Sequence, residues 1–252
     1  MNGGALDVFN QQMLQGKLYA QLPQRQRKVS FALDGIVIMQ QLAPNSYASI
    51  SFGKDSICLA HMLYRIAPGL PMYFLASWES FIIHNYDEVI ESFIAKWPIN
   101  LNIVMADNVS QNLDASWKKT RDIGQRDLQN MCNREDWDGW YWGLAKDESK
   151  GRRMTLSCKW GGQPHPTIFR YTDGKYRCCP LMNWNMKDIA AYVQEHGLPL
   201  LDIYRQYGLE MRTTARVTRN MAELGGVAYL KQLSTEKLNR LTARFPELRC
   251  YV

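Results

Sequence analysis

Segments with the patterns of strands and helices alternate along the middle of the chain, and this alternation restricts the fold more than any other feature. Residues 46–51 form a short strand-like run, residues 55–67 are typical of a helix that is apolar on nearly all sides, and residues 70–77 are continuously apolar. Parallel strands that are covered on both faces have such continuous runs. We therefore predict an α/β fold with a doubly wound, mostly parallel sheet, helices on both faces and a small helical C-terminal extension.

Local signals place further elements. Asn85 and Glu88 have the spacing of a capping box, Asn185 is a candidate cap of a later helix, and a last helix is expected to start at Ser234. Residues 167–179 are typical of a β-hairpin. Because ligands bind at the carboxyl ends of parallel strands, we expect the functional site to lie near the ends of these predicted strands.

Length and composition favour a globular protein with one large domain. The 252 residues are 46% hydrophobic, which is enough for a full core. We predict an N-terminal helical segment over residues 1–43, a nucleotide-binding α/β domain over 44–200 and a basic helical region over 201–252. No apolar run reaches the roughly 18 residues of a membrane span, and the start of the chain lacks the apolar segment of a secretory signal, so we expect a cytoplasmic protein that binds no membrane.

Positive charge is unevenly distributed along the chain. The formal net charge is +6, and residues 201–252 hold nine Lys or Arg against five Asp or Glu. Such an excess suits phosphate-rich ligands, whether nucleotide or nucleic acid. The basic stretch at Gln24–Lys28, in contrast, is predicted to be a solvated helix face.

The loop at Ser51–Ser56 has the features of an anion-binding site. Gly53 lets the backbone approach an anion closely, while the N–H groups and dipole of the following helix attract it. Lys54 adds a full charge, and the hydroxyls of Ser51 and Ser56 add donors. The alternative is that the loop binds no ligand and its residues have only structural roles. Ser51 would then be a helix cap, Gly53 a turn residue and Lys54 a solvated side chain.

This loop is not a Walker phosphate-binding loop, because Ala48 stands where that motif needs its first glycine and Asp55 follows the lysine. Instead, "SFGKDS" resembles the Ser-Gly-Gly-Lys-Asp-Ser pyrophosphate loop (PP-loop) of the adenine nucleotide α-hydrolase superfamily. Three further segments are similar to one branch of it, namely "GLAKDESKGRR" (143–153), "CPLMNWNMKDIAAYV" (179–193) and "LPLLDIYRQYG" (198–208). That branch contains phosphoadenylyl-sulfate (PAPS) reductase, the small subunit of bacterial ATP sulfurylase and the DNA phosphorothioation sulfur-transfer protein.

The resemblance implies roles for individual residues. It implies nucleotide binding by Ser51, Phe52, Gly53, Lys54, Asp55, Ser56, Gly143, Asp147 and Glu148, and catalytic roles for Lys54, Asp55, Arg152 and Arg153. The forked donors of a guanidinium suit the tetrahedral anions phosphate and sulfate. The two acids after the strand would orient the arginines or hold Mg²⁺ with nucleotide oxygens, or they are only part of a polar loop.

A loop that keeps its lysine, aspartate and serine fits the cleavage of ATP between the α and β phosphates, with catalysis by positioning and charge stabilisation. We therefore expect an ATP-dependent nucleotidyltransferase or pyrophosphatase in sulfur or sulfate chemistry, with Mg²⁺. One departure is "LASWES", where Trp78 and Glu79 replace the Asp-Thr-Gly type turn that the resemblance implies beside the adenosine. The identity of the acceptor stays open.

Two other functions are kept as alternatives. The first is a thioredoxin-linked PAPS or adenylyl-sulfate reductase that uses Cys250, although the tail "ELRCYV" lacks the Glu-Cys-Gly-Leu-His of many such enzymes. The second is a non-catalytic nucleotide sensor or DNA-associated regulator. Arg212, Arg216 and Arg219 would then bind nucleic acid; the resemblance instead places them over the anionic end of the nucleotide, and a solvated helix face is the third possibility.

Some relatives implied by the resemblance hold a [4Fe-4S] cluster with a Cys-Cys pair near the position of Cys178 and Cys179. A cluster here would also need Cys132 and Cys158, and the plainer interpretation is a pair of buried thiols. The expected partners are an adenine nucleotide and either a protein partner or a second copy of the chain.

Overall fold

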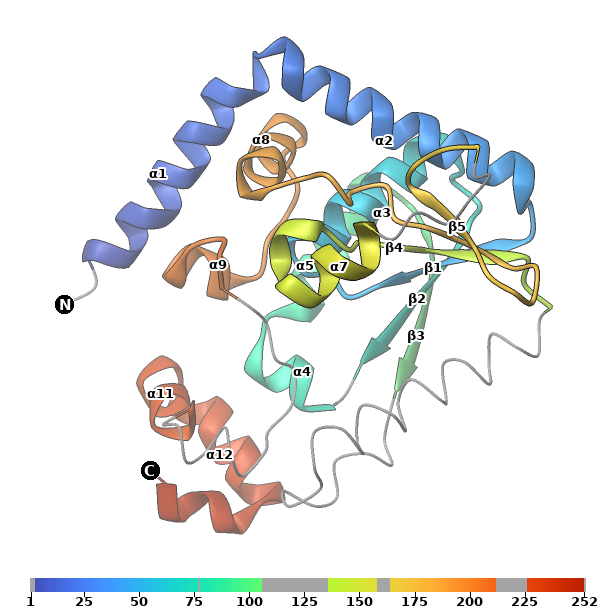
Figure 1. The fold of residues 1–252 in the computed structure, drawn as a ribbon. Helices are drawn as coiled ribbons and strands as arrows, with labels where there is room; N and C mark the ends of the chain where they lie inside the picture. The colour runs from blue at the N-terminus through green and yellow to red at the C-terminus, as the bar shows by residue number, and fades with distance from the viewer. Residues whose placement is uncertain (1–2, 77, 106–135, 158–163, 212–225, 252) are drawn as a thin grey trace.

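The computed structural model describes residues 3–76, 78–105, 136–157, 164–211 and 226–251 (Figure 1). Six strands form one sheet in the order β3-β2-β1-β4-β6-β5. All neighbouring strands are parallel except β5 and β6, which pair antiparallel as the predicted hairpin. The strands are β1 (Ser46–Ile50), β2 (Pro71–Ala76), β3 (Asn100–Met105), β4 (Gly139–Trp142), β5 (Ile168–Arg170) and β6 (Tyr176–Cys178). The predicted doubly wound α/β fold is confirmed.

Helices precede, connect and follow these strands. The first group is α1 (Gly3–Ala20), α2 (Pro23–Leu42), α3 (Lys54–Ile66), α4 (Trp78–Ile83) and α5 (Tyr86–Lys96). The second is η1 (Lys146–Glu148), α7 (Lys150–Ser157), α8 (Met186–His196), α9 (Asp202–Tyr207), α11 (Gly226–Leu233), α12 (Thr235–Arg244) and η2 (Pro246–Tyr251). Within the described residues, no helix is long and apolar enough to cross a membrane.

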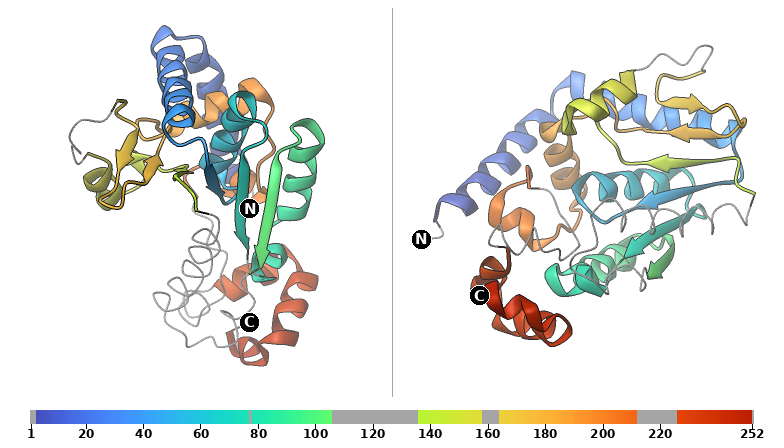
Figure 2. Two further views of the ribbon diagram at one scale, coloured as in Figure 1. Left: turned by 90° about the vertical axis from the view of Figure 1, so that its right-hand side faces the viewer. Right: turned by 60° about the horizontal axis from the view of Figure 1, so that its bottom comes forward.

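The main hydrophobic core lies on one face of the sheet, under α2, α3, α5 and α8 (Figure 2). Ile50 of β1 and Phe74 of β2 point into it. Successive residues of a strand point to opposite faces, so Tyr47 and Tyr73 lie on the other face, where they contact Trp137. On that second face Leu156 of α7 packs in a small cluster against the hairpin. The sheet therefore has apolar side chains on both faces, as the continuous apolar runs predict.

The two N-terminal helices form a long arm over the main core (Figure 1). α1 packs against α8, and a Cβ at Gly16 would lie 2.7 Å from Ala190. The prediction of a solvated face at Gln24–Lys28 is wrong for Arg25, whereas Lys28 is partly exposed. Arg25 is buried and pairs with Glu195 at 2.5 Å, and Lys28 pairs with Asp188 at 2.6 Å.

The predicted starts of three helices have different outcomes. Asn185 forms a capping box with Asp188 at the start of α8, so the predicted cap is confirmed. The last helix, expected to start at Ser234, is α12, and the hydroxyl of Ser234 accepts a hydrogen bond from the backbone N–H of Lys237 at 3.2 Å. The prediction of a capping box at Asn85 is wrong. The side-chain oxygen of Asn85 instead accepts a hydrogen bond from the backbone N–H of Asp202, 2.9 Å away. Asn85 thus joins α5 to the first residue of α9.

The C-terminal helices form a smaller core of their own. α4, α11, α12 and η2 enclose buried residues that include Ile82, Leu230, Leu241 and Leu248, and they lie beyond one end of the sheet (Figure 1). Tyr204 of α9, in contrast, is buried in the main core. The boundaries proposed at residues 43/44 and 200/201 stay a prediction.

Candidate active site

The site lies at the point in the sheet where the strand order reverses, with later strands added on the other side of β1. β1 pairs with β2 on one side and with β4 on the other, which makes the carboxyl ends of β1 and β4 the switch point of this α/β sheet. The segments that follow these strands come close together. A Cβ at Gly143 would lie 3.3 Å from the Cα of Ser56, so the absence of a side chain there lets the end of β4 approach the first turn of α3.

The loop after β1 is anchored by Phe52. This residue has a φ of 50°, in the left-handed region that is unfavourable for residues with a side chain, at a cost of about 1 to 2 kcal/mol. Its ring is 1% exposed and packs edge-to-face on Phe74 and Phe93, with centroid distances of 5.5 and 6.1 Å. The side chain of Phe52 therefore belongs to the core, and only its backbone is left to contact a ligand.

Lys54 is the first residue of α3 and is buried, with its Nζ 2.5 Å from a carboxylate oxygen of Asp55. The expectation that the N–H groups of the first helical turn bind an anion is not met at Lys54, because its backbone N–H donates to the hydroxyl of Tyr204 at 3.2 Å. The backbone N–H of Ser51 donates to the hydroxyl of Ser56 at 2.7 Å. Internal hydrogen bonds thus hold the loop and the start of α3 in place.

The turn after β4 places acids beside the two predicted arginines. A side-chain oxygen of Glu148 accepts from the backbone of Ala145 at 2.8 Å, and the same carboxylate pairs with Arg152. Asp147 lies 3.7 Å from Arg153. Both arginines are partly or largely exposed, so each can reorient toward a bound anion.

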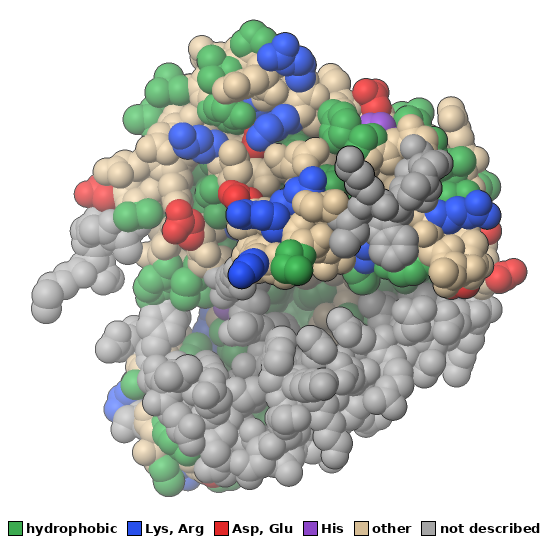
Figure 3. Space-filling model, in the orientation of Figure 1, with side chains coloured by type: hydrophobic (Ala, Val, Ile, Leu, Met, Phe, Trp, Pro, Cys, Tyr) green, Lys and Arg blue, Asp and Glu red, His purple; other side chains and the backbone are tan. Residues whose placement is uncertain are grey.

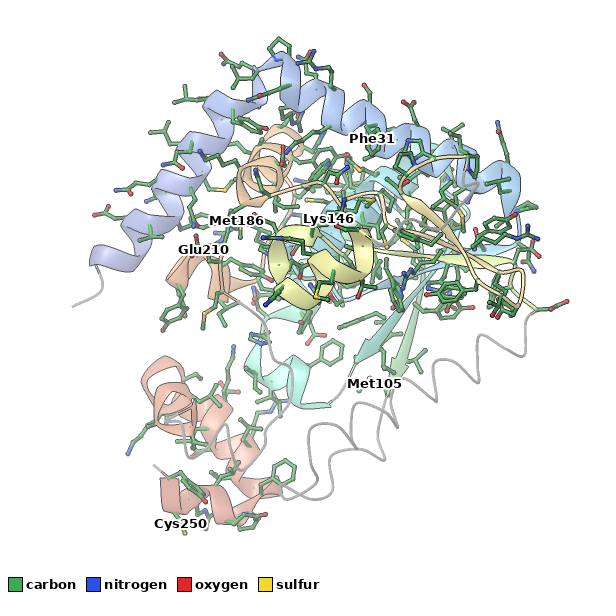
Figure 4. The ribbon with its side chains drawn as sticks, viewed as in Figure 1. Phe31, Met105, Lys146, Met186, Glu210 and Cys250 are labelled. Atoms are coloured by element: carbon green, nitrogen blue, oxygen red, sulfur yellow. The ribbon has the colours of Figure 1, made fainter. Side chains whose placement is uncertain are left out.

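These segments border a pocket of about 240 Å³. One wall is the start of α3, with Lys54 and Asp55; the second is the turn with Ala145, Asp147 and Glu148; the third is Trp184–Met186 at the start of α8; and Glu210 follows α9. Met186 and Glu210, which both line the pocket, are labelled in Figure 4. Acidic and basic side chains lie side by side on this face of the molecule (Figure 3).

The sequence did not indicate Trp184, Asn185, Met186 or Glu210 as residues of the site. The segment that contains Trp184 was matched to a family motif, but no ligand role was implied for it. In the structure the backbone N–H of Lys146 donates to the carbonyl of Met182 at 3.0 Å, which holds this segment against the turn after β4. Long-range contacts of this kind bring the third wall to the site.

The fold and this geometry agree with comparisons to known proteins. The sequence matches the phosphoadenosine phosphosulfate reductase domain over residues 45–229. The chain belongs to the phosphoadenosine phosphosulfate reductase family. It is 22% identical to the phosphoadenosine 5'-phosphosulfate reductase of Proteus mirabilis, over 87% of this chain and 86% of the relative. It is 24% identical to sulfate adenylyltransferase subunit 2 of Pseudomonas fluorescens, over 86% of this chain and 79% of the relative.

The crystal structure of phosphoadenylyl-sulfate (PAPS) reductase from Candida auris has the same fold. It superposes with a TM-score of 0.50 at 16% sequence identity and covers 68% of this chain and 82% of that chain. The adenine nucleotide α-hydrolase-like fold that the resemblance implied is thereby confirmed.

The two adjacent cysteines of this family member do not fit a shared iron–sulfur cluster. Cys178 faces the main core, with its Sγ 3.7 Å from the carbonyl oxygen of Gly35, whereas Cys179 packs with Leu156 on the other face. Burial raises the pKa of the Cys179 thiol to about 12 and also raises that of the Cys178 thiol. The two thiols therefore behave as neutral core side chains on opposite faces of the sheet.

The other proposed cluster ligands, Cys132 and Cys158, lie outside the described residues, as do Arg212, Arg216 and Arg219. Among the residues that the structure does describe, no group of three or more His, Cys, Asp or Glu is arranged to hold a metal ion. Trp78 and Glu79 begin α4, but their side chains are outside the described part.

Cys250 is exposed on η2, in the C-terminal helical cluster. Figure 4 places it at the opposite end of the molecule from Lys146 and Met186. Its thiol does not line the pocket in this conformation.

Proposed function

We propose that this member of the family binds an adenine nucleotide through Ser51–Ser56 and cleaves ATP between its α and β phosphates. The position of Lys54 carries the proposal. Its ammonium group is buried at the first turn of α3, on the wall of a pocket at the switch point of the sheet, and only the adjacent Asp55 pairs with it among the described residues. A pyrophosphate group at this place would contact the ammonium group and the positive end of the helix dipole.

Each predicted catalytic cation is paired with an acid of the chain. Lys54 pairs with Asp55, Arg152 with Glu148 and Arg153 with Asp147. A polyanionic ligand would exchange these partners for its own oxygens and draw the three cations around the leaving pyrophosphate. Catalysis would then consist mostly of positioning and of stabilising the charge that develops on the leaving group.

The acidic residues of the pocket fit a hard cation that accompanies a nucleotide. Mg²⁺ binds one or two carboxylates together with phosphate oxygens, and Asp147 and Glu210 are both exposed on the pocket wall. A bound Mg²⁺ would neutralise part of the negative charge of the phosphate groups. Asp147, released from Arg153, and Glu210 would hold this ion.

A second candidate function is the reduction of PAPS or adenylyl sulfate, with Cys250 as the thiol. The name of the Proteus mirabilis relative supports it, since the alignment covers 87% of this chain. The location of Cys250 does not, because that thiol would have to leave the C-terminal cluster to reach the pocket.

The experiment that separates these functions is a turnover panel with ATP, adenylyl sulfate and PAPS. We expect AMP and pyrophosphate from ATP with Mg²⁺, and a rate about 100- to 1,000-fold lower for Lys54→Ala. Lys231→Ala removes an exposed lysine of α11 and is the matched control, expected to leave the rate unchanged. With reduced thioredoxin added as the electron donor, sulfite formed from PAPS and lost in Cys250→Ser would establish the reductase instead. Binding of no member of the panel would refute both.

A further inference from the structure

The N-terminal arm, which consists of α1 and α2, is attached to two segments that form part of the pocket wall. α1 packs along α8 and α9, and Figure 1 shows it beside both. α8 begins directly after Asn185, at Met186, and these two residues line the pocket, as does Glu210 after α9. The arm precedes residues 45–229, over which the family domain matches. Its contacts with the wall are therefore a feature of this chain that the family match does not describe.

One contact is the ion pair between Lys28 of α2 and Asp188 in the first turn of α8. The Nζ of Lys28 lies 2.6 Å from a carboxylate oxygen of Asp188, and the same oxygen accepts from the backbone N–H of Asn185 at 2.8 Å. Asp188 is 1% exposed, and among the described residues Lys28 is the cation that pairs with it. Lys28 therefore neutralises the buried carboxylate that closes the capping box at the pocket end of α8.

Loss of the Lys28 ammonium group would leave this carboxylate buried without a counter-charge. Such a charge is strongly unfavourable in a protein interior, so the side chain moves toward water or loses its charge. Either change alters the hydrogen bond to the backbone N–H of Asn185, and the wall at Asn185 and Met186 shifts with it. A displacement on the order of 1 Å is enough to spoil the geometry of a site.

A second contact joins α1 to the segment that leads into Glu210. The side-chain oxygen of Gln12 accepts from the backbone N–H of Leu209 at 2.7 Å, and Leu209 is fully buried. Gly208 allows this approach, since a Cβ there would lie 3.0 Å from Val8 and 3.1 Å from the oxygen of Gln12. Gln12 thus fixes the backbone one residue before Glu210.

We propose that Lys28 and Gln12 are positioning residues of the nucleotide site, which hold two segments of its wall from outside the pocket. Lys28 acts through Asp188, and Gln12 acts through Leu209. Neither Lys28 nor Gln12 lines the pocket. The inference deepens the proposed function and rests on it, because it takes this pocket as the place where the anionic end of the nucleotide binds. The arm would then contribute to ligand binding as well as to the stability of the core.

The first test measures binding to the full chain by calorimetry, at a temperature where circular dichroism shows each variant to be folded. The probes are inorganic pyrophosphate and α,β-methylene ATP, which cannot be cleaved between these two phosphates. We expect Lys28→Met to lower the affinity for both probes about three- to thirtyfold. Lys28→Arg keeps the charge and should restore most of the affinity.

The arm supplies two matched controls for Lys28→Met. Arg27→Met removes an exposed cation from the same helix and controls for net charge. Arg25→Met breaks the ion pair of the arm with Glu195, which lies about 10 Å further along α8 from the pocket end. Both variants should bind the probes as the native chain does, even where Arg25→Met lowers the melting temperature more than Lys28→Met.

The second test determines whether Lys28 acts through Asp188. Asp188→Asn removes the charge that needs Lys28 but keeps a side-chain oxygen that can accept from Asn185. We expect Lys28→Met combined with Asp188→Asn to bind pyrophosphate within about threefold of the native chain, so that the two substitutions are not additive. A merely structural role of Lys28 would lower the melting temperature and the binding stoichiometry but leave the Kd of the folded protein unchanged.

The third test addresses α1 in the same way. Gln12→Leu leaves the buried N–H of Leu209 without its acceptor, and we expect the affinity for both probes to fall about three- to thirtyfold. Gln11→Leu changes the exposed neighbouring glutamine and should leave the affinity as it is.

A fall in affinity for Lys28→Met no larger than that for Arg27→Met would overturn the role of Lys28. So would a double variant that binds no better than Lys28→Met, because the effect would not pass through Asp188. Native affinity in Gln12→Leu would overturn the role of Gln12. Arm-dependent binding of pyrophosphate without cleavage of ATP would refute the proposed function and leave this inference standing. Failure of the native chain to bind either probe would refute both.

Discussion

The backbone N–H of Lys54 donates to the hydroxyl of Tyr204, 3.2 Å away, so a side chain of α9 caps the helix that begins at the pocket. Tyr204 is only 3% exposed, and water therefore cannot easily replace its hydroxyl. We expect Tyr204→Phe to lower the free energy of unfolding by about 1 to 2 kcal/mol, because a buried donor loses its acceptor. Urea denaturation measures this, and Tyr64→Phe, half-buried on α3, is the control. A change of similar size in the two variants would contradict the assignment.

Phe52 allows a test of the left-handed backbone of the loop. Replacement by alanine removes a buried ring and should cost about 3 to 5 kcal/mol of stability. Glycine removes the same ring but adopts a φ of 50° without strain, so we expect Phe52→Gly to be about 1 kcal/mol more stable than Phe52→Ala. At a position with negative φ the order would be reversed. Thermal unfolding of the two variants side by side decides between these orders.

The close contact of α1 with α8 predicts a strong effect at Gly16. A Cβ there would lie 2.7 Å from the backbone of Ala190 and Ala191, and neither can move without displacing α8. Gly16→Ala should therefore destabilise the protein by about 1 to 3 kcal/mol and expose α1 to limited proteolysis. Gly151→Ala is the matched control, since nothing lies within 4 Å of its Cβ and alanine favours α7. Unchanged protease resistance in Gly16→Ala would show that α1 is not held in this way.

His61 gives the stability a defined dependence on pH. Burial, with smaller contributions from His196 and Arg65, lowers the pKa of His61 to about 4. Its Nδ1 lies 2.9 Å from the hydroxyl of Tyr192. Between pH 6.5 and 4 the unfolded chain binds a proton at this residue and the folded chain does not, so stability falls as the pH falls.

The loss over this range should approach about 3 kcal/mol for His61 alone. Urea denaturation at pH 7, 5.5 and 4 measures it, and His61→Phe should flatten the profile. A slope that stays the same in His61→Phe would assign it to other groups.

Elements with local signals could be predicted from the sequence. The hairpin turns at Gly174, whose φ is 88°, and α8 begins at the Asn185 capping box and ends at Gly197. These features depend on neighbouring residues, and the alternation of strands and helices restricts the topology to a few possibilities. The mostly parallel sheet and the expectation of a site at the carboxyl ends of its strands follow from the same pattern, whereas the order of the strands is known only from the structure.

The contacts between distant segments could not be predicted in this way. Arg25 has the appearance of a surface residue in the sequence, but α2 brings it to Glu195 across the protein. Asn85 has the spacing of a cap for its own helix but binds Asp202. Trp184 and Glu210 reach the pocket only because the chain folds back after β6 and α9. The hydrophobic periodicity of a segment does not indicate which distant segment it contacts in the folded protein.

The opposite orientations of Cys178 and Cys179 have a consequence for oxidative chemistry. Two thiols that project from opposite sides of a sheet cannot close into a vicinal disulfide unless β6 separates from its neighbours. Peroxide or a trivalent arsenical would therefore find no dithiol at this position while the sheet is intact. The pair that stands out most in the printed sequence is, in the folded protein, two unrelated core residues.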